Sequence, residues 1–342
     1  MSTIKTLTGK TLTGIKPTGI PHLGNYVGAI RPAIEESRRD DIKSYYFLAD
    51  YHAIISTWDP AQVHESTRNI AAVWLALGLD TDRATFYRQS DIPEIPELCW
   101  ILNCMAAKGL MNRAHAYKAS MDVNVAEGSD PDKGITMGLY DYPVLMAADI
   151  LMFNANRVPV GKDQIQHIEM ARDIAGRFNH VYKGEYFTLP EAIVGENSAV
   201  LRGLDGRKMS KSYGNVIPLF CPEKPFRKHI MKIVTNSLEP GEPKDADTCT
   251  LFQIFSAFAR TEAEIAAKRK QYEEGAGWGA LKQELFEYLN EELKGPRIEY
   301  DRLIADPAFI EAELKKGAEK ARAESAPFLK TIREAIGLRP LA

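Results

Sequence analysis

The chain has 342 residues, of which 26% are charged, and its formal net charge is −3. This length exceeds what one small domain needs and can bury a large core without disulfides or metals. Phosphate groups are bound through Lys and Arg, so a chain that is not basic overall can meet nucleic acid only at local positive patches. The sequence begins MSTIKTLTGK, without an apolar signal core, and has no stretch of membrane-spanning length. We therefore expect a cytoplasmic protein with no membrane partner.

The four cysteines form no Cys-x-x-Cys pair and lie outside any His-rich setting; they are Cys99, Cys104, Cys221 and Cys249. This spacing disfavours a zinc or iron–sulfur site. We predict reduced structural thiols and no metal site built by the protein.

The first half of the chain alternates short β-rich runs with helical patterns. Strands are predicted at 11–15, 43–50, 84–89 and 157–160. Helices are predicted at 23–38, 60–77, 96–107, 136–154 and 163–178. This alternation is typical of an α/β fold, a Rossmann-like parallel sheet with helices on both faces. Ligands in such folds bind at the carboxyl ends of the strands, near the switch point.

The second half, after about Arg207, is dominated by helical patterns. We predict helices at 251–272, 281–293 and 307–336, the last broken near Pro327. The polar, turn-rich run 127–134 predicts a mobile loop. The expected organisation is a Rossmann-like catalytic domain at 1–203, a lysine loop at 204–216, a helical domain at 217–306, and a C-terminal helical segment at 307–342 that packs back on the catalytic domain.

A first chemical signal, PTGIPHLGN at 17–25, falls where the first strand passes into the first helix. Gly24 would let a nucleotide approach the backbone closely. The helix N-terminus offers free N–H groups to phosphate, and His22 and Asn25 are neutral donors beside it. The alternative is an ordinary strand–turn–helix with a satisfied histidine.

A second signal is the glycine-flanked run GRKMSKS at 206–212. Lys208 and Lys211 could move onto a pentavalent phosphate and stabilise charge that grows in the transition state. An isolated Lys-x-x-Lys is more often a solvated basic loop. The order of the two signals along the chain favours a phosphate site instead.

Together, His-Leu-Gly-Asn and Lys-Met-Ser-Lys-Ser resemble the paired signature motifs of class I aminoacyl-tRNA synthetases. The runs GIKPTG at 14–19, NYVGAI at 25–30, DIL at 149–151 and VPVGKDQIQH at 158–167 resemble the bacterial tryptophanyl-tRNA synthetase family in particular. The resemblance implies a homodimer that uses ATP with Mg²⁺, L-tryptophan and tRNA(Trp), with one tRNA bridging both subunits. It implies that the helical domain, 217–306, reads the anticodon.

The helix predicted at 136–154 carries Tyr142, Met146, Asp149 and Phe153 on one face. Asp149 is therefore a carboxylate in an apolar stripe, and it needs a partner. Indole offers one N–H donor and no acceptor, so a single carboxylate with apolar walls matches it. The alternative is a structural carboxylate paired with an Arg or a helix end.

The resemblance assigns roles to individual residues. It implies catalytic roles for Lys208, Lys211, His22 and Asn25. It implies ATP binding by Lys16, Pro17, Thr18, Gly24, Asn25, Gly161, Lys162, Asp163, Lys208, Met209, Ser210 and Lys211. It implies tryptophan binding by His52, Tyr142, Met146, Asp149, Gln164, Val158 and Val160. The chain departs from the family pattern at Leu12, Lys16, Ser120 and Lys162.

Three other functions compete with this interpretation. A tyrosyl-tRNA synthetase shares the fold, but should carry polar partners for a phenol. A small-molecule nucleotidyltransferase would have no use for the long helical region. A non-catalytic RNA-binding paralogue should have lost residues of the phosphate site. Basic clusters at 224–232 and 268–270 could contact tRNA phosphates, or could be solvated helix faces.

Overall fold

The computed structural model describes residues 9–194 and 201–341. Most of the N-terminal stretch used to argue against a signal peptide, and residues 195–200 near the expected end of the catalytic domain, therefore lie outside the described residues. The strands are β1 (Gly9–Ile15), β2 (Ile42–Leu48), β3 (Thr85–Arg88), β4 (Arg157–Pro159) and β5 (Glu191–Ile193).

The helices of the first part are α1 (Leu23–Asn25), α2 (Arg31–Ser37), α3 (Asp50–Ala53), α4 (Pro60–Ala76), α5 (Glu94–Asn103), α6 (Lys108–Met111), α7 (His115–Ala126), α8 (Met137–Met152) and α9 (Ile165–Val181). Those of the second part are α10 (Glu223–Met231), α11 (Thr250–Phe258), α12 (Glu262–Glu273), α13 (Trp278–Ala305) and α14 (Pro307–Ala335). A π-helical turn, η1 (Tyr26–Ile30), joins α1 to α2, and 3-10 turns occur at η2 (Gln89–Asp91), η3 (Lys162–Gln164) and η4 (Lys211–Tyr213).

In the described part of the chain the strands form one parallel sheet in the order β3-β2-β1-β4-β5. β1 is central, with β2 on one side and β4 on the other. The chain moves outward from β1 to β3 and later returns to add β4 on the opposite side of β1. The switch point of this sheet therefore lies between β1 and β4, at their carboxyl ends. The prediction of a Rossmann-like parallel sheet with a helical region after it is confirmed.

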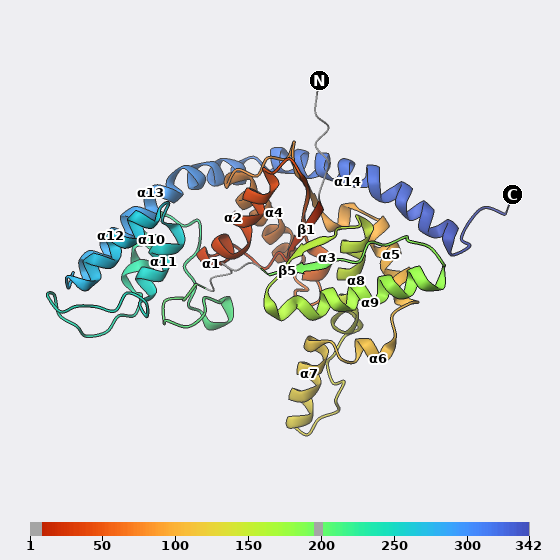
Figure 1. The fold of residues 1–342 in the computed structure, drawn as a ribbon, viewed down its shortest axis with the longest axis horizontal. Coiled ribbons are helices and arrows are strands. Elements are labelled where there is room, and N and C mark those ends of the chain that lie inside the picture. Colours follow the sequence, from red (N-terminus) through yellow and green to blue (C-terminus); the bar gives the residue numbers. More distant parts are fainter. Residues whose placement is uncertain (1–8, 195–200, 342) are drawn as a thin grey trace.

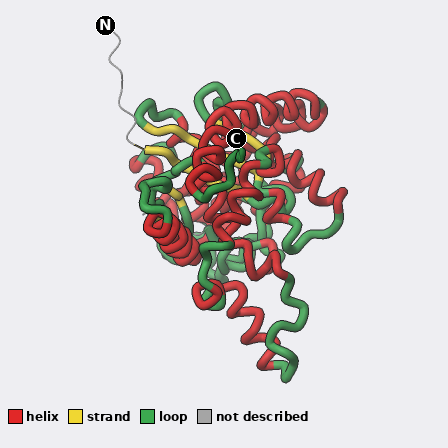
Figure 2. Tube along the Cα trace, turned by 90° about the vertical axis from the view of Figure 1, so that its right-hand side faces the viewer, coloured by secondary structure: helices red, strands yellow, loops and turns green. Residues whose placement is uncertain are grey.

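Side chains of β2 alternate between two buried cores, as the pleat of a strand requires. Tyr46 and Leu48 pack in one core, against Trp74 of α4. Tyr45 and Phe47 pack in the other core, which contains residues of α5, α8 and α9. Figure 2 shows helices around the strands of the sheet. Both faces are covered, which explains the nearly continuous apolar run of β2.

The helical region shares a core with the first half. The core around Tyr46 continues without interruption into Phe226 of α10, Leu251 of α11 and Leu285 of α13. Helices α10 to α13 lie at one end of the molecule, and α14 runs back along the sheet to the other end (Figure 1). Helix α14 contacts β3 most extensively, and it also contacts α4, α5, α8 and α13.

Several predicted elements differ from those observed. The strand predicted at 43–50 ends at Leu48, because Asp50 begins α3. The helix predicted at 251–272 is two helices, since the Thr261 hydroxyl caps a new N-terminus by accepting the N–H of Glu264 at 3.2 Å. The break predicted near Pro327 is wrong: α14 continues through it, and buried Ser325 and Leu329 hold both sides against the first half. No helix or strand was predicted from the sequence at the positions of α6, α7, α10 and β5.

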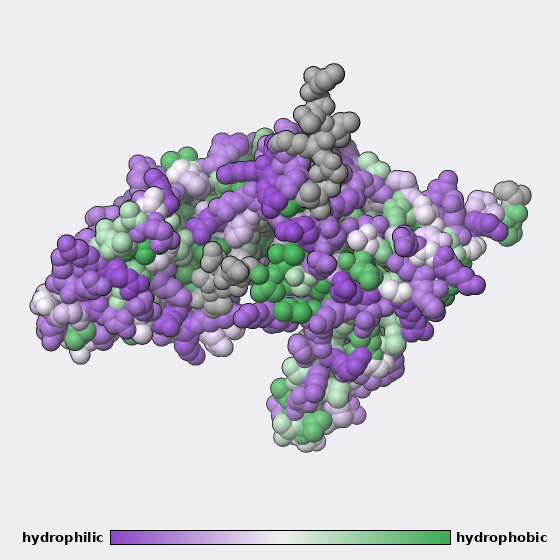
Figure 3. All heavy atoms as spheres, in the orientation of Figure 1, coloured by the Kyte–Doolittle hydropathy of each residue, from purple (hydrophilic) through white to green (hydrophobic). Residues whose placement is uncertain are grey.

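The surface carries polar residues over most of the face drawn in Figure 3, with apolar side chains gathered on the projecting α7 segment. Val123 and Val125 are exposed there. Among the described residues, no helix combines the length and apolar character needed to cross a bilayer.

The contact between α14 and β3 depends on Gly317. A Cβ at this position would overlap the backbone carbonyl of Phe86, which cannot move without disturbing β3. We expect Gly317→Ala to lower the free energy of unfolding by about 3 kcal/mol. Gly176→Ala in α9 is the matched control, because a Cβ there meets nothing within 4 Å; it should raise stability by about 0.5–1 kcal/mol. Urea unfolding curves measure both, and equal stability of the two variants would contradict this packing.

Candidate active site

A cavity of about 220 Å³ lies at the carboxyl ends of β1, β2 and β4, beside the switch point. All seven residues predicted to bind tryptophan line it, namely His52, Tyr142, Met146, Asp149, Val158, Val160 and Gln164. Lys16, predicted on the ATP side, also lines it. The structure thus brings together residues from 16 to 164 around one space.

Asp149 forms the polar end of this cavity. It is 1% exposed and comes from α8. His52 Nε2 lies 2.9 Å from Oδ2, and Gln89 Nε2 donates to Oδ1 at 2.8 Å and to Oδ2 at 3.0 Å. Burial raises the pKa of Asp149 above its ordinary value, and the hydrogen bonds from His52 and Gln89 oppose that rise. The partners of this carboxylate are therefore an imidazole and an amide, rather than the Arg or helix end of the structural alternative.

The other walls are aromatic and aliphatic. Leu12, Phe47 and Ile150 line the cavity, and a Cβ at Gly14 would overlap the ring of Phe47. Tyr142 and His167 lie across from them, with 2.7 Å between the hydroxyl and Nε2. Burial is the largest cause that lowers the pKa of His167, so this imidazole is neutral at neutral pH.

The first motif forms a capping box at the start of α1. The N–H of His22 donates to Asn25 Oδ1 at 3.1 Å, and the N–H of Asn25 donates to His22 Nδ1 at 3.3 Å. Because Nδ1 accepts, the neutral ring carries its proton on Nε2. Burial, with the nearby charge of Lys211, lowers the pKa of His22 to about 4. His22 is therefore neutral near pH 7, with Nε2 as its donor.

The lysine loop lies directly against this motif. Lys211 Nζ donates to the carbonyl of Thr18 at 2.7 Å, and Met209 is buried in the core beside Gly24. Lys208 is exposed. Partial burial lowers the pKa of Lys211, although the residue as a whole lies on an exposed turn. Segments that are far apart in the sequence thus form one phosphate-side surface.

Comparison with known proteins identifies the family. The model of class I tRNA synthetases (W and Y) matches residues 7–294. The chain is 61% identical to a tryptophan–tRNA ligase of Pseudomonas aeruginosa, over 98% of this chain and 75% of that protein. It is 57% identical to a tryptophan–tRNA ligase of Xanthomonas campestris, over 98% and 78%.

The chain belongs to the tryptophanyl branch of the class I tRNA synthetases. A solved tryptophanyl-tRNA synthetase from Campylobacter jejuni, complexed with ADP and tryptophan, superposes with a TM-score of 0.86 at 42% identity, covering 96% of this chain and 99% of that one. A tyrosyl-tRNA synthetase from Archaeoglobus fulgidus, at 21% identity and a TM-score of 0.64, shares the fold alone.

Three polar residues of the synthetase site were missed from the sequence: Gln89, His167 and Asn215. Asn215 is 3% exposed; its side chain accepts the N–H of Ser210 at 2.8 Å and donates to the carbonyl of Lys208 at 3.0 Å. It therefore fixes the backbone between the two lysines. A Cβ at Gly203 would overlap Asn215, so this glycine leaves it room.

The remaining predicted ATP residues are neighbours in the sequence of residues that line the cavity: 17–18 follow Lys16, and 161–163 lie between Val160 and Gln164. Lys16 Nζ donates to Ser56 Oγ at 2.8 Å, and burial lowers its pKa. Lys162 and Asp163 are exposed on η3, and a Cβ at Gly161 would lie 2.6 Å from Asp163 Oδ1. Pro17 is buried and Thr18 is exposed. No described cluster of His, Cys, Asp and Glu could hold a metal ion.

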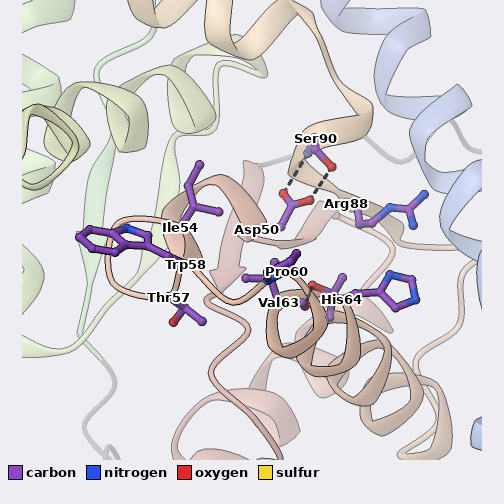
Figure 4. A pocket seen from close by; sticks show the side chains of 10 residues that line it. Asp50, Ile54, Thr57, Trp58, Pro60, Val63, His64, Arg88 and Ser90 are labelled. Atoms are coloured by element: carbon purple, nitrogen blue, oxygen red, sulfur yellow. Dashed lines mark hydrogen bonds between the residues drawn. The ribbon is translucent and has the colours of Figure 1, made fainter.

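A second, larger cavity of about 560 Å³ lies between α3, α4 and the end of β3 (Figure 4). Its lining includes Trp58, which is 79% exposed, and His64. Asp50 is already engaged there, accepting the N–H of Ser90 at 3.0 Å. The predicted tryptophan and ATP residues lie outside this cavity, so size alone does not mark the site.

The protonation of His22 provides a test of the phosphate-side geometry. An NMR titration of the ring should give a midpoint near pH 4. Lys211→Ala removes a positive neighbour and should raise that midpoint. Lys315→Ala, which removes an exposed lysine of α14, should leave it unchanged. A midpoint near the ordinary value of 6.5 in the wild type would show that His22 is not the buried neutral donor described.

Proposed function

We propose that this synthetase activates L-tryptophan with ATP to tryptophanyl-adenylate and transfers the aminoacyl group to tRNA(Trp). The observation that carries the proposal is the buried carboxylate of Asp149, the one carboxylate among the described residues that line the cavity, beside apolar walls that include Leu12, Phe47 and Ile150. Indole is an apolar double ring with one N–H donor and no acceptor, so it matches apolar walls with a carboxylate at one end. The identity to tryptophan–tRNA ligases along nearly the whole chain supports the same substrate.

Selection against other aromatic amino acids follows from Asp149. Phenylalanine would occupy the apolar walls and leave the buried carboxylate without a ligand donor. A site built to bond a donor rejects analogues that lack it by about 10⁴-fold. Tyrosine carries its hydroxyl at the far end of a single ring, so its donor is placed differently from the indole N–H. Met146, with a flexible thioether, can adapt to the flat indole face.

The activation step uses the surface formed by the two motifs. The neutral His22 can donate to a phosphate oxygen through Nε2, whereas the N–H groups of Leu23 and Asn25 are already bonded, to the carbonyl of Ile217 and to Nδ1 of His22. The carboxylate of tryptophan attacks the α-phosphorus, and pyrophosphate leaves with Mg²⁺, which enters as part of the ATP substrate. Lys208 and Lys211 act on the charge that grows in the transition state. Asn215 positions both lysines through the backbone between them.

The tRNA is expected to meet the helical region. Within the cluster at 268–270, Lys268 pairs with Glu284 at 2.5 Å and Arg269 with Asp247 at 2.7 Å, so its charge is largely neutralised. Lys224 and Lys228 of α10 are exposed. We therefore favour α10 for phosphate contacts. Residues 217–306 would read the anticodon, and the enzyme would act as a homodimer in the cytoplasm, with one tRNA bridging both subunits.

The substrate assignment can be tested by ATP–pyrophosphate exchange with each of the twenty amino acids. Tryptophan should support exchange, while phenylalanine and tyrosine should be weaker by about 10⁴-fold in kcat/KM. Asp149→Ala should weaken tryptophan far more than ATP, because the contact is to the amino acid. Equal rates with tryptophan and tyrosine would overturn the assignment.

Lys211 provides a separate test of the lysine loop. Lys211→Ala should lower the rate of tryptophan activation by roughly 10²-fold or more, with little change in the KM for tryptophan, because its contact strengthens only in the transition state. Pre-steady-state adenylate formation measures the rate. Lys315→Ala serves as the control for loss of an exposed lysine. An effect confined to the KM for tryptophan would contradict this role.

A further inference from the structure

Gln89 is a fully buried amide that faces the active-site carboxylate. It begins η2, directly after β3, and has no exposed surface. Its Oε1 accepts the backbone N–H of Tyr51 at 3.1 Å, beside His52. This bond fixes which end of the carboxamide is the oxygen, so that Nε2 faces Asp149.

The hydrogen bonds on the two oxygens of Asp149 are unequal. Oδ2 is bonded by His52 Nε2 at 2.9 Å and by Gln89 Nε2 at 3.0 Å. Among the described residues, Oδ1 receives one bond, from Gln89 Nε2 at 2.8 Å. A carboxylate oxygen has two lone pairs. Oδ1 therefore keeps one acceptor position, while both positions on Oδ2 are used.

We propose that Gln89 is a specificity-determining positioning residue, which orients the Asp149 carboxylate and leaves Oδ1 as the acceptor for the indole N–H. This proposal rests on the assignment of Asp149 to tryptophan recognition. Gln89 acts through Asp149, and we assign it no contact with tryptophan. Its oxygen is engaged by Tyr51, so the amide cannot turn and present an acceptor of its own.

The residues around Asp149 make the Gln89 amide important for the ionisation of the Asp149 carboxylate. Asp50 of α3 raises the pKa of Asp149, and His52 lowers it. Burial raises the pKa of Tyr87 of β3 and of Cys99 of α5, and the nearby charge of Asp149 raises each further. The Tyr87 hydroxyl is buried and has no hydrogen-bond partner in the described part of the chain. Gln89 and His52 are therefore the donors that keep a desolvated carboxylate charged.

The proposal can be separated from simple packing by a pair of substrates. We would compare tryptophan with β-(benzothiophen-3-yl)alanine, in which sulfur replaces the N–H, in ATP–pyrophosphate exchange. The wild type should prefer tryptophan by roughly 10²-fold in kcat/KM. Gln89→Met introduces an apolar side chain of similar length and removes both N–H donors of the carboxamide. It should reduce this preference by about tenfold and leave the KM for ATP nearly unchanged.

The pH dependence of the preference for tryptophan gives a second readout. A role of Gln89 in packing alone would leave that pH dependence unchanged. In Gln89→Met the pKa of Asp149 should rise further, because a donor to the carboxylate is lost, so the preference for tryptophan should increase as the pH is raised. Gln89→Glu donates only while protonated and otherwise places two carboxylates together. The preference of Gln89→Glu for tryptophan should therefore fall as the pH is raised, which is opposite to the trend expected for Gln89→Met. This variant also tests the proposal if the Met variant folds poorly.

Tyr87→Phe is the matched control, because it removes a buried polar atom two residues away that donates no bond to Asp149. It should keep the wild-type preference and pH profile. Equal loss of both substrates in Gln89→Met, with no pH trend in either Gln89 variant, would overturn the positioning role. A wild type that does not prefer tryptophan over the sulfur analogue would instead overturn recognition of the indole N–H by Asp149.

Discussion

The active site depends on a carboxylate held away from water. Burying an ionised carboxylate costs several kcal/mol in real proteins unless it is paired and hydrogen-bonded. At Asp149 that cost is offset by donors from two other segments, His52 in α3 and Gln89 in η2. These donors come from the ends of neighbouring parallel strands, β2 and β3. The sheet therefore has to form with its register intact before the cavity has its acceptor.

The same topology explains why recognition and chemistry lie side by side. β1 is the strand on which the order of the sheet reverses, and the segment that follows it carries Lys16, Thr18 and His22. β4, its other neighbour, leads into Gly161 and Gln164. The helix between these halves, α8, supplies Asp149. A ligand that reaches from Asp149 to His22 must therefore cross the switch point, where polar loops from both halves are available.

Much of this arrangement could be predicted from the sequence, for physical reasons. The sheet follows from β-rich runs that alternate with helical periods, and Asp149 from its place in an apolar helical stripe. Gln89, His167 and Asn215 were missed because a neutral polar residue in a buried position leaves no periodic or charge pattern. Their importance comes from partners far away in the sequence, such as Asp149 for Gln89. The helix break predicted at Pro327 was wrong for a related reason. Packing of α14 on both sides of Pro327 outweighs the preference of proline to interrupt a helix.

The two sides of the site differ in how firmly their groups are held, and this difference suits their tasks. Asp149 is fixed by several bonds in a fully buried setting, so in the proposed function substrate identity is read by a preorganised acceptor. Lys211 lies on an exposed turn, where its ammonium donates to the carbonyl of Thr18. A hydrogen bond that involves a charged group contributes about 1.5–3 kcal/mol, and a contact between the ammonium and a phosphate would replace it. The lysine can therefore leave that carbonyl for a phosphate at small cost, which allows its contact to strengthen as charge develops. In the reaction that we propose, the firmly held carboxylate of Asp149 selects the amino acid, and the loosely held ammonium of Lys211 lowers the activation barrier.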